Sequence, residues 1–256
     1  MLEPVRKARQ FRELHSPGTP LVLFNVWDPG SAQAVATGGA KAIATSSWAV
    51  AHATGFADGE QLPLPFVIEN LRRIVAVTEL PVTVDLESGY GEAPESVGNS
   101  IALAVDVGAV GCNLEDRVPA DGRLRSAAEQ VLRVRAARRA AEAAGRAFFI
   151  NARTDLFLQR PATEHDEAMV GEALERAKRY RDGGADGLFV PGLIDIQLIA
   201  ALVAASPLPV NVMVQEGTPP LATLAEHGVA RVSHGAEPYL LTMKALEAAA
   251  RAALRS

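Results

Sequence analysis

The sequence predicts a closed (β/α)8 barrel, also called a TIM barrel, formed by a single α/β domain over residues 1–256. Three observations predict it. Short apolar, β-branched runs alternate with longer Ala-rich segments of helical pattern, which is typical of a parallel sheet. This alternation repeats eight times in 256 residues, as a closed barrel requires. The first run is followed by "DPGSAQ" and lacks the Gly-x-Gly-x-x-Gly of a dinucleotide-binding fold.

The expected strands occupy residues 20–28, 41–47, 80–87, 109–116, 147–155, 186–192, 208–215 and 230–235. Helical patterns lie between them, as at 65–79 and 167–184, and several end in a glycine, which tolerates the conformation that stops a helix. We expect residues 48–63 to form a long loop that walls a site. Residues 237–256 predict an amphipathic helix, which either docks on another subunit or packs on its own barrel.

Composition excludes several classes of function. A formal net charge of −5 and the lack of any Lys/Arg-rich run disfavour nucleic acid and anionic membranes as partners. The single cysteine, Cys112, excludes an intrachain disulfide and is expected in the core. No apolar run approaches the ~20 residues of a membrane span, and the first residues lack the apolar stretch of a signal peptide. We therefore expect a soluble cytoplasmic protein.

Acidic residues end two of the expected strands. Because active sites of such barrels lie at the carboxyl ends of the strands, and residues two apart share a face, the inward side chains there indicate a site. The third strand turns Thr83, Asp85 and Glu87 inward before "SGYGE", and the fourth turns Asn113 and Glu115 inward. The fifth and seventh strands add further inward residues: Asn151, Arg153, Asp155, Asn211, Met213 and Gln215.

We expect Asp58, Asp85, Glu87 and Glu115 to converge, with Arg153 as the main nearby cation. Asp85 and Glu87 would lie roughly 7 Å apart along their strand, so their charges need a proton or a counter-ion. A donor set of oxygens without His or Cys favours Mg²⁺, with Mn²⁺ as the alternative, over Zn²⁺. Two simpler interpretations stay open: a strand-end Asp is commonly a cap, and Arg153 could be a structural ion-pair partner.

Several segments together resemble the isocitrate lyase / phosphoenolpyruvate mutase superfamily, in particular its short bacterial phosphonomutase-like members. They are "NVWDPGSAQ" (25–33), "AIATSSWAVAHATGFADGE" (42–60), "LPVTVDLESGYGE" (80–92), "GAVGCNLEDR" (108–117), "INARTD" (150–155), "YRDGGADGLFVPG" (180–192) and "HGVARVS" (227–233). The resemblance implies a barrel whose last helix is exchanged between subunits of a dimer or a dimer of dimers, a homotetramer.

The resemblance also implies site roles. Asp85 would be the direct Mg²⁺ ligand, while Asp58, Glu87 and Glu115 would hold the waters of the metal. Ser46, Ser47 and Trp48 would present backbone N–H groups to the substrate, and Arg153 would bind it; we add Asn211 as a further candidate contact. The implied chemistry is C–C or C–P bond cleavage or rearrangement of a small 2-oxo acid through a metal-stabilised enolate, the activity of a lyase, mutase or hydrolase.

The loop after the fourth strand departs from the superfamily pattern. Isocitrate and methylisocitrate lyases carry a Lys-x-Cys-Gly-His lid there, whereas this chain has "EDRVPADGRLRSAAEQ", so we do not expect those activities. Arg117 takes the place of the Lys of phosphonopyruvate-processing members. With Arg123 and Arg125, Arg117 could close a lid, about 117–126, on an anionic substrate or simply form an exposed basic loop. The alternatives are a non-catalytic Mg²⁺/2-oxo acid binding protein or sensor, and a phosphate-binding barrel.

Overall fold

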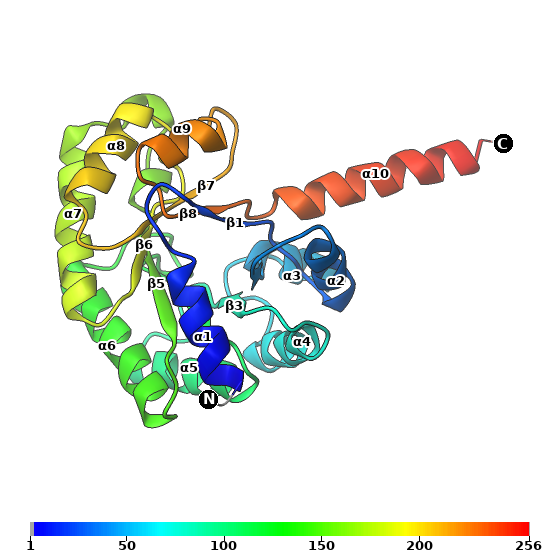
Figure 1. Cartoon of the computed structure of the whole chain (residues 1–256), viewed down its shortest axis with the longest axis horizontal. Coiled ribbons are helices and arrows are strands. Elements are labelled where there is room, and N and C mark those ends of the chain that lie inside the picture. Colours follow the sequence, from blue (N-terminus) through cyan, green and yellow to red (C-terminus); the bar gives the residue numbers. More distant parts are fainter. Residues whose placement is uncertain (1–2, 256) are drawn as a thin grey trace.

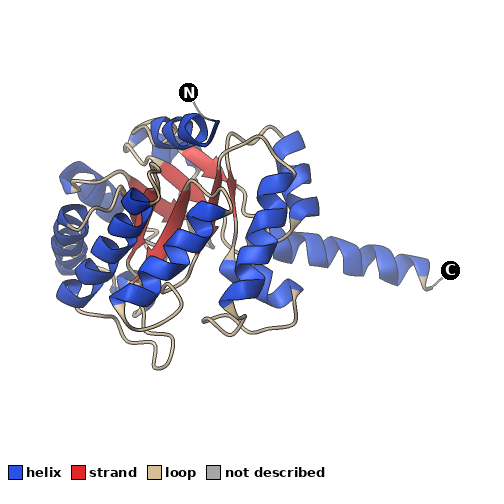
Figure 2. Ribbon diagram, turned by 90° about the horizontal axis from the view of Figure 1, so that it is seen from below, coloured by secondary structure: helices blue, strands red, loops and turns tan. Residues whose placement is uncertain are grey.

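The computed structural model describes residues 3–255, so the first two residues and Ser256 of the expected domain lie outside it. Eight parallel strands form one sheet with helices around it (Figures 1 and 2), which confirms the predicted eight-stranded α/β barrel class. Each expected strand contains an observed one: β1 (Leu21–Leu23), β2 (Ile43–Ala44), β3 (Val82–Asp85), β4 (Gly111–Glu115), β5 (Phe149–Arg153), β6 (Gly187–Phe189), β7 (Val210–Met213) and β8 (Arg231–Ser233).

The barrel is nearly closed. The strand order runs β1-β8-β7-β6-β5-β4-β3-β2, so closure depends on contact between β1 and β2. Just beyond these strands, a parallel bridge joins Val26 to Thr45. The Val26 amide donates to the Ala44 carbonyl at 2.8 Å, and the Ser46 amide donates to the Val26 carbonyl at 3.0 Å. This short seam brings β1 and β2 together at the carboxyl ends of the strands.

Helices follow most of the strands and cover the sheet. Before the β1 strand lies α1 (Glu3–Glu13), and between the strands lie α2 (Pro29–Thr37), α3 (Ser47–Ala53), α4 (Leu64–Ala76), α5 (Pro94–Asp106), α6 (Ala127–Ala143), η1 (Leu156–Leu158), η2 (Ala162–Glu164), α7 (Glu167–Asp182), α8 (Ile196–Ala205) and α9 (Leu221–Glu226). The chain ends in α10 (Glu237–Ala253). No helix within the described residues is long and apolar enough to span a membrane.

Side chains alternate across the strands as the period of two requires. Val82, Val84 and Leu86 join the outer core beneath the helices, and Cys112 is fully buried in the same layer. A smaller apolar cluster fills the amino-terminal end of the barrel, where α1 contributes Phe11. The expected outward orientation of the apolar β3 side chains therefore agrees with the packing.

The segment after β2 differs from the expected loop over 48–63. Its first part forms α3, because the Ser46 side chain caps the helix by accepting from the Ala49 amide at 3.3 Å, and an Ala-rich sequence follows. Only residues 54–63 form a connection, which leads into α4. The loop that walls the mouth is therefore shorter than expected and begins at the end of a helix.

The last helix, α10, extends away from the barrel in both views (Figures 1 and 2). Its leucines remain exposed, with 51% exposure at Leu240, 52% at Leu241 and 61% at Leu246. Of the two expectations for this segment, packing on its own barrel is thus not what the structure shows.

Candidate active site

Asp85 ends β3 beside the first turn of α3. Its Oδ2 accepts from the Ser47 hydroxyl at 3.1 Å, and its backbone N–H donates to the Thr45 hydroxyl at 2.9 Å. Ser47 and Trp48 are the first two residues of α3, where amides have no intrahelical acceptor. A half-buried carboxylate and a helix N-terminus with amides to donate thus lie together at the carboxyl end of the barrel.

Arg153 ends β5 between two carboxylates. Its Nη1 lies 2.9 Å from Oε2 of Glu115, which ends the neighbouring strand β4. On its other side, Nε and Nη2 donate to Asp155 at 2.5 and 2.9 Å. The structural interpretation of Arg153 as an ion-pair partner is therefore correct for both acids. Because a guanidinium has five N–H donors, two remain for a ligand.

Glu87 lies two residues beyond Asp85 and reaches the connection that carries Asp58. Its Oε2 accepts from the amides of Gly59 and Glu60 at 2.8 and 2.6 Å, and its Oε1 accepts from the Tyr90 hydroxyl at 3.2 Å. Glu87 is buried, whereas Asp58 is exposed as a residue. This arrangement ties the Asp58 segment to the end of β3.

The electrostatics of the mouth reflect crowded negative charge. Burial, followed by the charge of Asp58, raises the pKa of Glu87 to about 7. The partial burial of the Asp58 carboxyl group, followed by the charge of Asp85, raises the pKa of Asp58 as well. Burial raises the pKa of Glu115 well above its usual value even though Arg153 opposes the shift. One arginine therefore does not neutralise the acids that converge here.

The donor set fits a divalent cation with bound waters. Hydrogen bonds satisfy Asp85 only in part, since beyond the Ser47 hydroxyl its oxygens have the amides of Ser47 and Glu87 at 3.5 and 3.4 Å. Within residues 3–255, no three His, Cys, Asp or Glu side chains are grouped closely enough to hold a metal among themselves. One carboxylate as a direct ligand, with others acting through water, agrees with this spacing and with how proteins bind Mg²⁺.

The remaining predicted residues take different places. Asn211 is buried inside the barrel and donates to the Ser233 hydroxyl at 3.2 Å, so it lies in the polar interior of the barrel. Ser46 is buried and its side chain caps α3, while its amide donates to the Val26 carbonyl at 3.0 Å, so the expectation that this amide faces a substrate is wrong. Arg117 is exposed on the segment after β4, where a bridge pairs it with Leu124.

The basic loop after β4 is a fastened hairpin. Arg125 is buried and its Nη1 donates to the Arg117 carbonyl at 2.6 Å, while Arg176 of α7 donates to the Arg125 carbonyl at 2.9 Å. Arg176 also pairs with the fully buried Asp116 at 3.0 Å. The expectation that Arg125 closes on a substrate is therefore wrong, because its guanidinium is used to hold the loop.

Sequence reasoning missed the roles of Glu60 and Asp116. Glu60 binds the turn after β3, and Asp116 anchors the hairpin after β4. The only local signal for Glu60 is its place after Gly59 in "ADGEQ", which is typical of a turn. Asp116 sits in "NLED", where a buried acid cannot be distinguished from a site acid without its partners, Arg176 and Tyr180.

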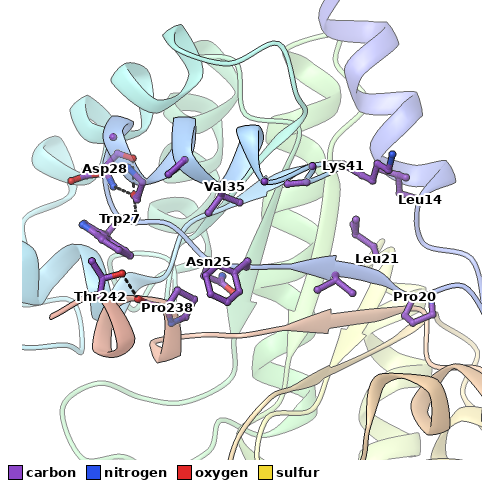
Figure 3. Close-up of a pocket in the computed structure, with 18 of the residues that line it drawn as sticks. Leu14, Pro20, Leu21, Asn25, Trp27, Asp28, Val35, Lys41, Pro238 and Thr242 are labelled. Atoms are coloured by element: carbon purple, nitrogen blue, oxygen red, sulfur yellow. Dashed lines mark hydrogen bonds between the residues drawn. The ribbon is translucent and has the colours of Figure 1, made fainter. Parts of the chain in front are cut away.

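A separate groove of about 1090 Å³ lies on the outside of the barrel. Residues of β1, α2 and the first turn of α10 line it, among them Trp27, Val35 and Pro238 (Figure 3). Trp27 also contacts Tyr239 of α10 edge-on, with ring centroids 5.1 Å apart. This groove lies apart from the acids of the mouth, and it leaves the outer face of β1 without a helix from its own chain.

A parallel barrel with a charged, oxygen-rich mouth is the arrangement of a TIM-barrel enzyme site. The phosphoenolpyruvate phosphomutase family matches residues 11–254, nearly the whole chain. Because a 2-methylisocitrate lyase of Salmonella typhimurium is also 30% identical over 93% of this chain and 83% of that enzyme, the chain belongs to the phosphoenolpyruvate mutase/isocitrate lyase superfamily, which confirms the resemblance expected from its motifs.

Individual relatives agree with this membership. A crystal structure of a Burkholderia cenocepacia protein, provisionally described as a phosphonomutase, matches with a TM-score of 0.96 and 56% identity, covering 98% of this chain and 99% of that one. An uncharacterized protein of Mycobacterium tuberculosis is 36% identical over 242 residues, which are 94% of this chain and 88% of that protein. The oxaloacetate decarboxylase of Pseudomonas syringae is 32% identical over 248 residues, 93% of this chain and 81% of that enzyme. The chain is thus an enzyme of this superfamily by its relatives, as predicted.

Proposed function

We propose that the protein is a Mg²⁺-dependent enzyme that cleaves or rearranges a C–C or C–P bond in a small 2-oxo acid. The observation that carries the proposal is the convergence of Asp58, Asp85, Glu87 and Glu115 on one mouth, where Arg153 pairs with Glu115. A relative that decarboxylates oxaloacetate and one provisionally described as a phosphonomutase support the substrate class.

Asp85 would hold the metal directly, and Asp58, Glu87 and Glu115 would hold its waters. When bound, Mg²⁺ supplies Lewis-acid polarisation of the substrate carbonyl and offsets the negative charge of an enolate. Mn²⁺ has similar ligand preferences and is expected to substitute.

The protein groups orient the substrate. The two free N–H donors of Arg153 suit a carboxylate, and Glu115 and Asp155 fix the plane of the guanidinium. The amides of Ser47 and Trp48 at the start of α3 suit an oxyanion, since donors already aimed at a developing charge need no rearrangement. Arg117, exposed at the rim, would meet a second anionic group of the substrate.

A substrate panel tests the proposal. Oxaloacetate, phosphonopyruvate and 2-methylisocitrate are incubated with protein and Mg²⁺, with EDTA and the Asp85→Asn variant as controls. We expect Mg²⁺-dependent turnover of at least one compound, with oxaloacetate as the first candidate because an oxaloacetate decarboxylase is a relative. Binding of oxalate without turnover of any compound would favour the alternative, a 2-oxo acid sensor, which the missing Cys and His of the loop at 117–126 motivates.

We also propose that the protein is a homo-oligomer in which α10 of one subunit fills the groove of another. The exposed leucines of α10 and the uncovered outer face of β1 are complementary in character. Sedimentation of the Leu246→Glu variant tests this, with Leu132→Glu on α6 as a matched control, because Leu132 is likewise exposed, at 51% against 61%. A dimer or tetramer that only Leu246→Glu dissociates supports the exchange, whereas a monomeric wild type overturns it.

A further inference from the structure

Two segments at the mouth hold each other through their acidic side chains. Glu87, after β3, accepts from the amides of Gly59 and Glu60. In return, Oε1 of Glu60 accepts from the Ser88 hydroxyl at 2.6 Å and from the Tyr90 amide at 2.8 Å. We call this reciprocal set, formed by Gly59, Glu60, Glu87, Ser88 and Tyr90, the loop–turn clasp.

The backbone of the clasp is strained. Within residues 3–255, the only residues other than glycine with a positive φ are Glu60 at 60°, Glu87 at 50° and Tyr90 at 57°. This left-handed conformation is unfavourable for residues that carry a Cβ atom. Strain of this kind persists where surrounding contacts enforce it and gathers at functional sites. All three residues belong to the clasp, so its contacts enforce an unfavourable backbone on both segments.

A buried arginine supports the clasp from below. Arg133 of α6 donates to the carbonyls of Ser88 and Glu92, and to that of Gly91 at 2.9 Å. Arg133 is 2% exposed, and all three of these hydrogen bonds go to backbone carbonyl oxygens. The turn after β3 is therefore fixed to the barrel, and the segment with Asp58 is fixed to that turn.

We propose that Glu60 is a positioning residue that sets Asp58 at the mouth by closing the loop–turn clasp. Asp58 is exposed and lies two residues from Glu60, and the very next residue, Gly59, is the first whose amide donates a hydrogen bond to Glu87. Without the Glu60 carboxylate, Ser88 and Tyr90 lose their acceptor, and two of the four hydrogen bonds between the connection and the turn are lost. The inference rests on the proposed function, because it assigns Asp58 a task at the metal.

The test compares Glu60→Gln with Glu60→Asn. Both variants are neutral amides, and the Gln oxygen can still accept from Ser88 and Tyr90, whereas the Asn side chain is one methylene too short. Asn tolerates a positive φ better than Gln does. If Glu60 matters only for local folding, Asn is the better substitute; if it positions Asp58, Gln is. Gln33→Asn, the same shortening at an exposed residue of α2 away from the clasp, is the control.

The first measurement is the affinity for Mg²⁺ in the presence of oxalate, by titration calorimetry. We expect Glu60→Asn to weaken it about 10- to 100-fold, the range for lost outer-shell support of a metal. Glu60→Gln should stay within about fivefold of the wild type, less than 1 kcal/mol. Equal affinities for the two variants, or a better Asn variant, would overturn the inference.

The second measurement is amide hydrogen exchange of residues 57–61, which needs no ligand. We expect faster exchange in Glu60→Asn than in Glu60→Gln, because local opening follows the loss of contacts. If the wild type does not bind Mg²⁺ and oxalate at all, the proposed function fails while exchange still tests the clasp. Unchanged exchange in the Asn variant would contradict the inferred role of the loop–turn clasp without contradicting the proposed function.

Discussion

The two ends of the barrel are built on opposite principles. At the amino-terminal end, Phe11 of α1 is fully buried and meets Phe149 edge-on, with ring centroids 5.6 Å apart. His15 stacks on the same Phe149 ring at 4.0 Å, and burial lowers its pKa to about 3, so it stays neutral. At the carboxyl end, acids face one another across strained turns. One end therefore stabilises the fold, while the other carries destabilising charge that a ligand can offset.

The largest effect should follow from the charged end. Asp85→Ala removes the proposed direct ligand, so we expect Mg²⁺-dependent oxalate binding to fall by roughly 1,000-fold or more, about 4 kcal/mol. The thermal midpoint of the metal-free protein should not fall, because the substitution removes a negative charge that lies close to Asp58 and Glu87. Calorimetric titration and thermal unfolding measure both. Retained metal affinity in this variant would show that the cation binds elsewhere.

Phe11→Ala should lower the stability of the fold without changing ligand binding at the charged end. Loss of a fully buried aromatic side chain typically costs about 3–5 kcal/mol of unfolding free energy. Denaturant unfolding measures this cost, and oxalate affinity should remain that of the wild type. Phe66→Ala is the matched control, because Phe66 is 61% exposed and its loss should stay within about 0.5 kcal/mol. A large loss of ligand affinity in Phe11→Ala would contradict the separation of the two ends.

The stability of the metal-free protein should depend on pH through Glu87 at the charged end. The pKa of Glu87 is about 7 in the folded protein against an ordinary 4.5, so the folded state holds this proton more tightly. Protonated Glu87 therefore contributes up to about 3 kcal/mol to the free energy of unfolding. This contribution is fully present below pH 4.5 and is lost as the pH rises through about 7. Unfolding of the metal-free protein across this window measures it. Glu87→Gln should flatten the profile, and an unchanged slope would place the titrating group elsewhere.

The smallest effect should come from the rim. Arg117→Ala removes an exposed cation, so we expect about a fivefold weaker affinity for a dianion such as oxalate, near 1 kcal/mol. High salt should shrink this difference, since exposed charges are screened. The control is Arg123→Ala, whose guanidinium already pairs with Asp121 at 3.3 Å. Equal losses in both variants would indicate a general charge effect.

The sequence predicted most of the fold because its signals are local. Apolar runs, glycines at helix ends and period-two alternation located each strand, and they turned Val84 outward and Asp85 toward the mouth. The start of α3 was missed because its cap, Ser46, lies directly at the end of a strand. The departure of α10 from the barrel could not be predicted, since its amphipathic pattern suits its own barrel and a neighbour equally.

The site was predictable in its acids but not in their partners. Asp85, Glu115 and Arg153 end their strands at inward-facing positions, and the alternation of side chains along each strand predicts this orientation. The hydrogen bond between the Tyr90 amide and Glu60, 30 residues apart, leaves no local signature. Arg125 could not be distinguished from a substrate-binding cation, because the side chain that binds its carbonyl, Arg176, comes from a distant helix.

The short seam between β1 and β2 has a dynamic consequence. The strands of the barrel pair along most of its circumference, but β1 and β2 are joined only just beyond their ends, by the bridge between Val26 and Thr45. Thermal fluctuations that open the sheet should start at this bridge, because few backbone hydrogen bonds hold the two strands together there. Since the Ser46 amide belongs to it, such an opening would reach the cap of α3 first, and the Ser47 and Trp48 amides that we propose as oxyanion donors would loosen before the rest of the mouth.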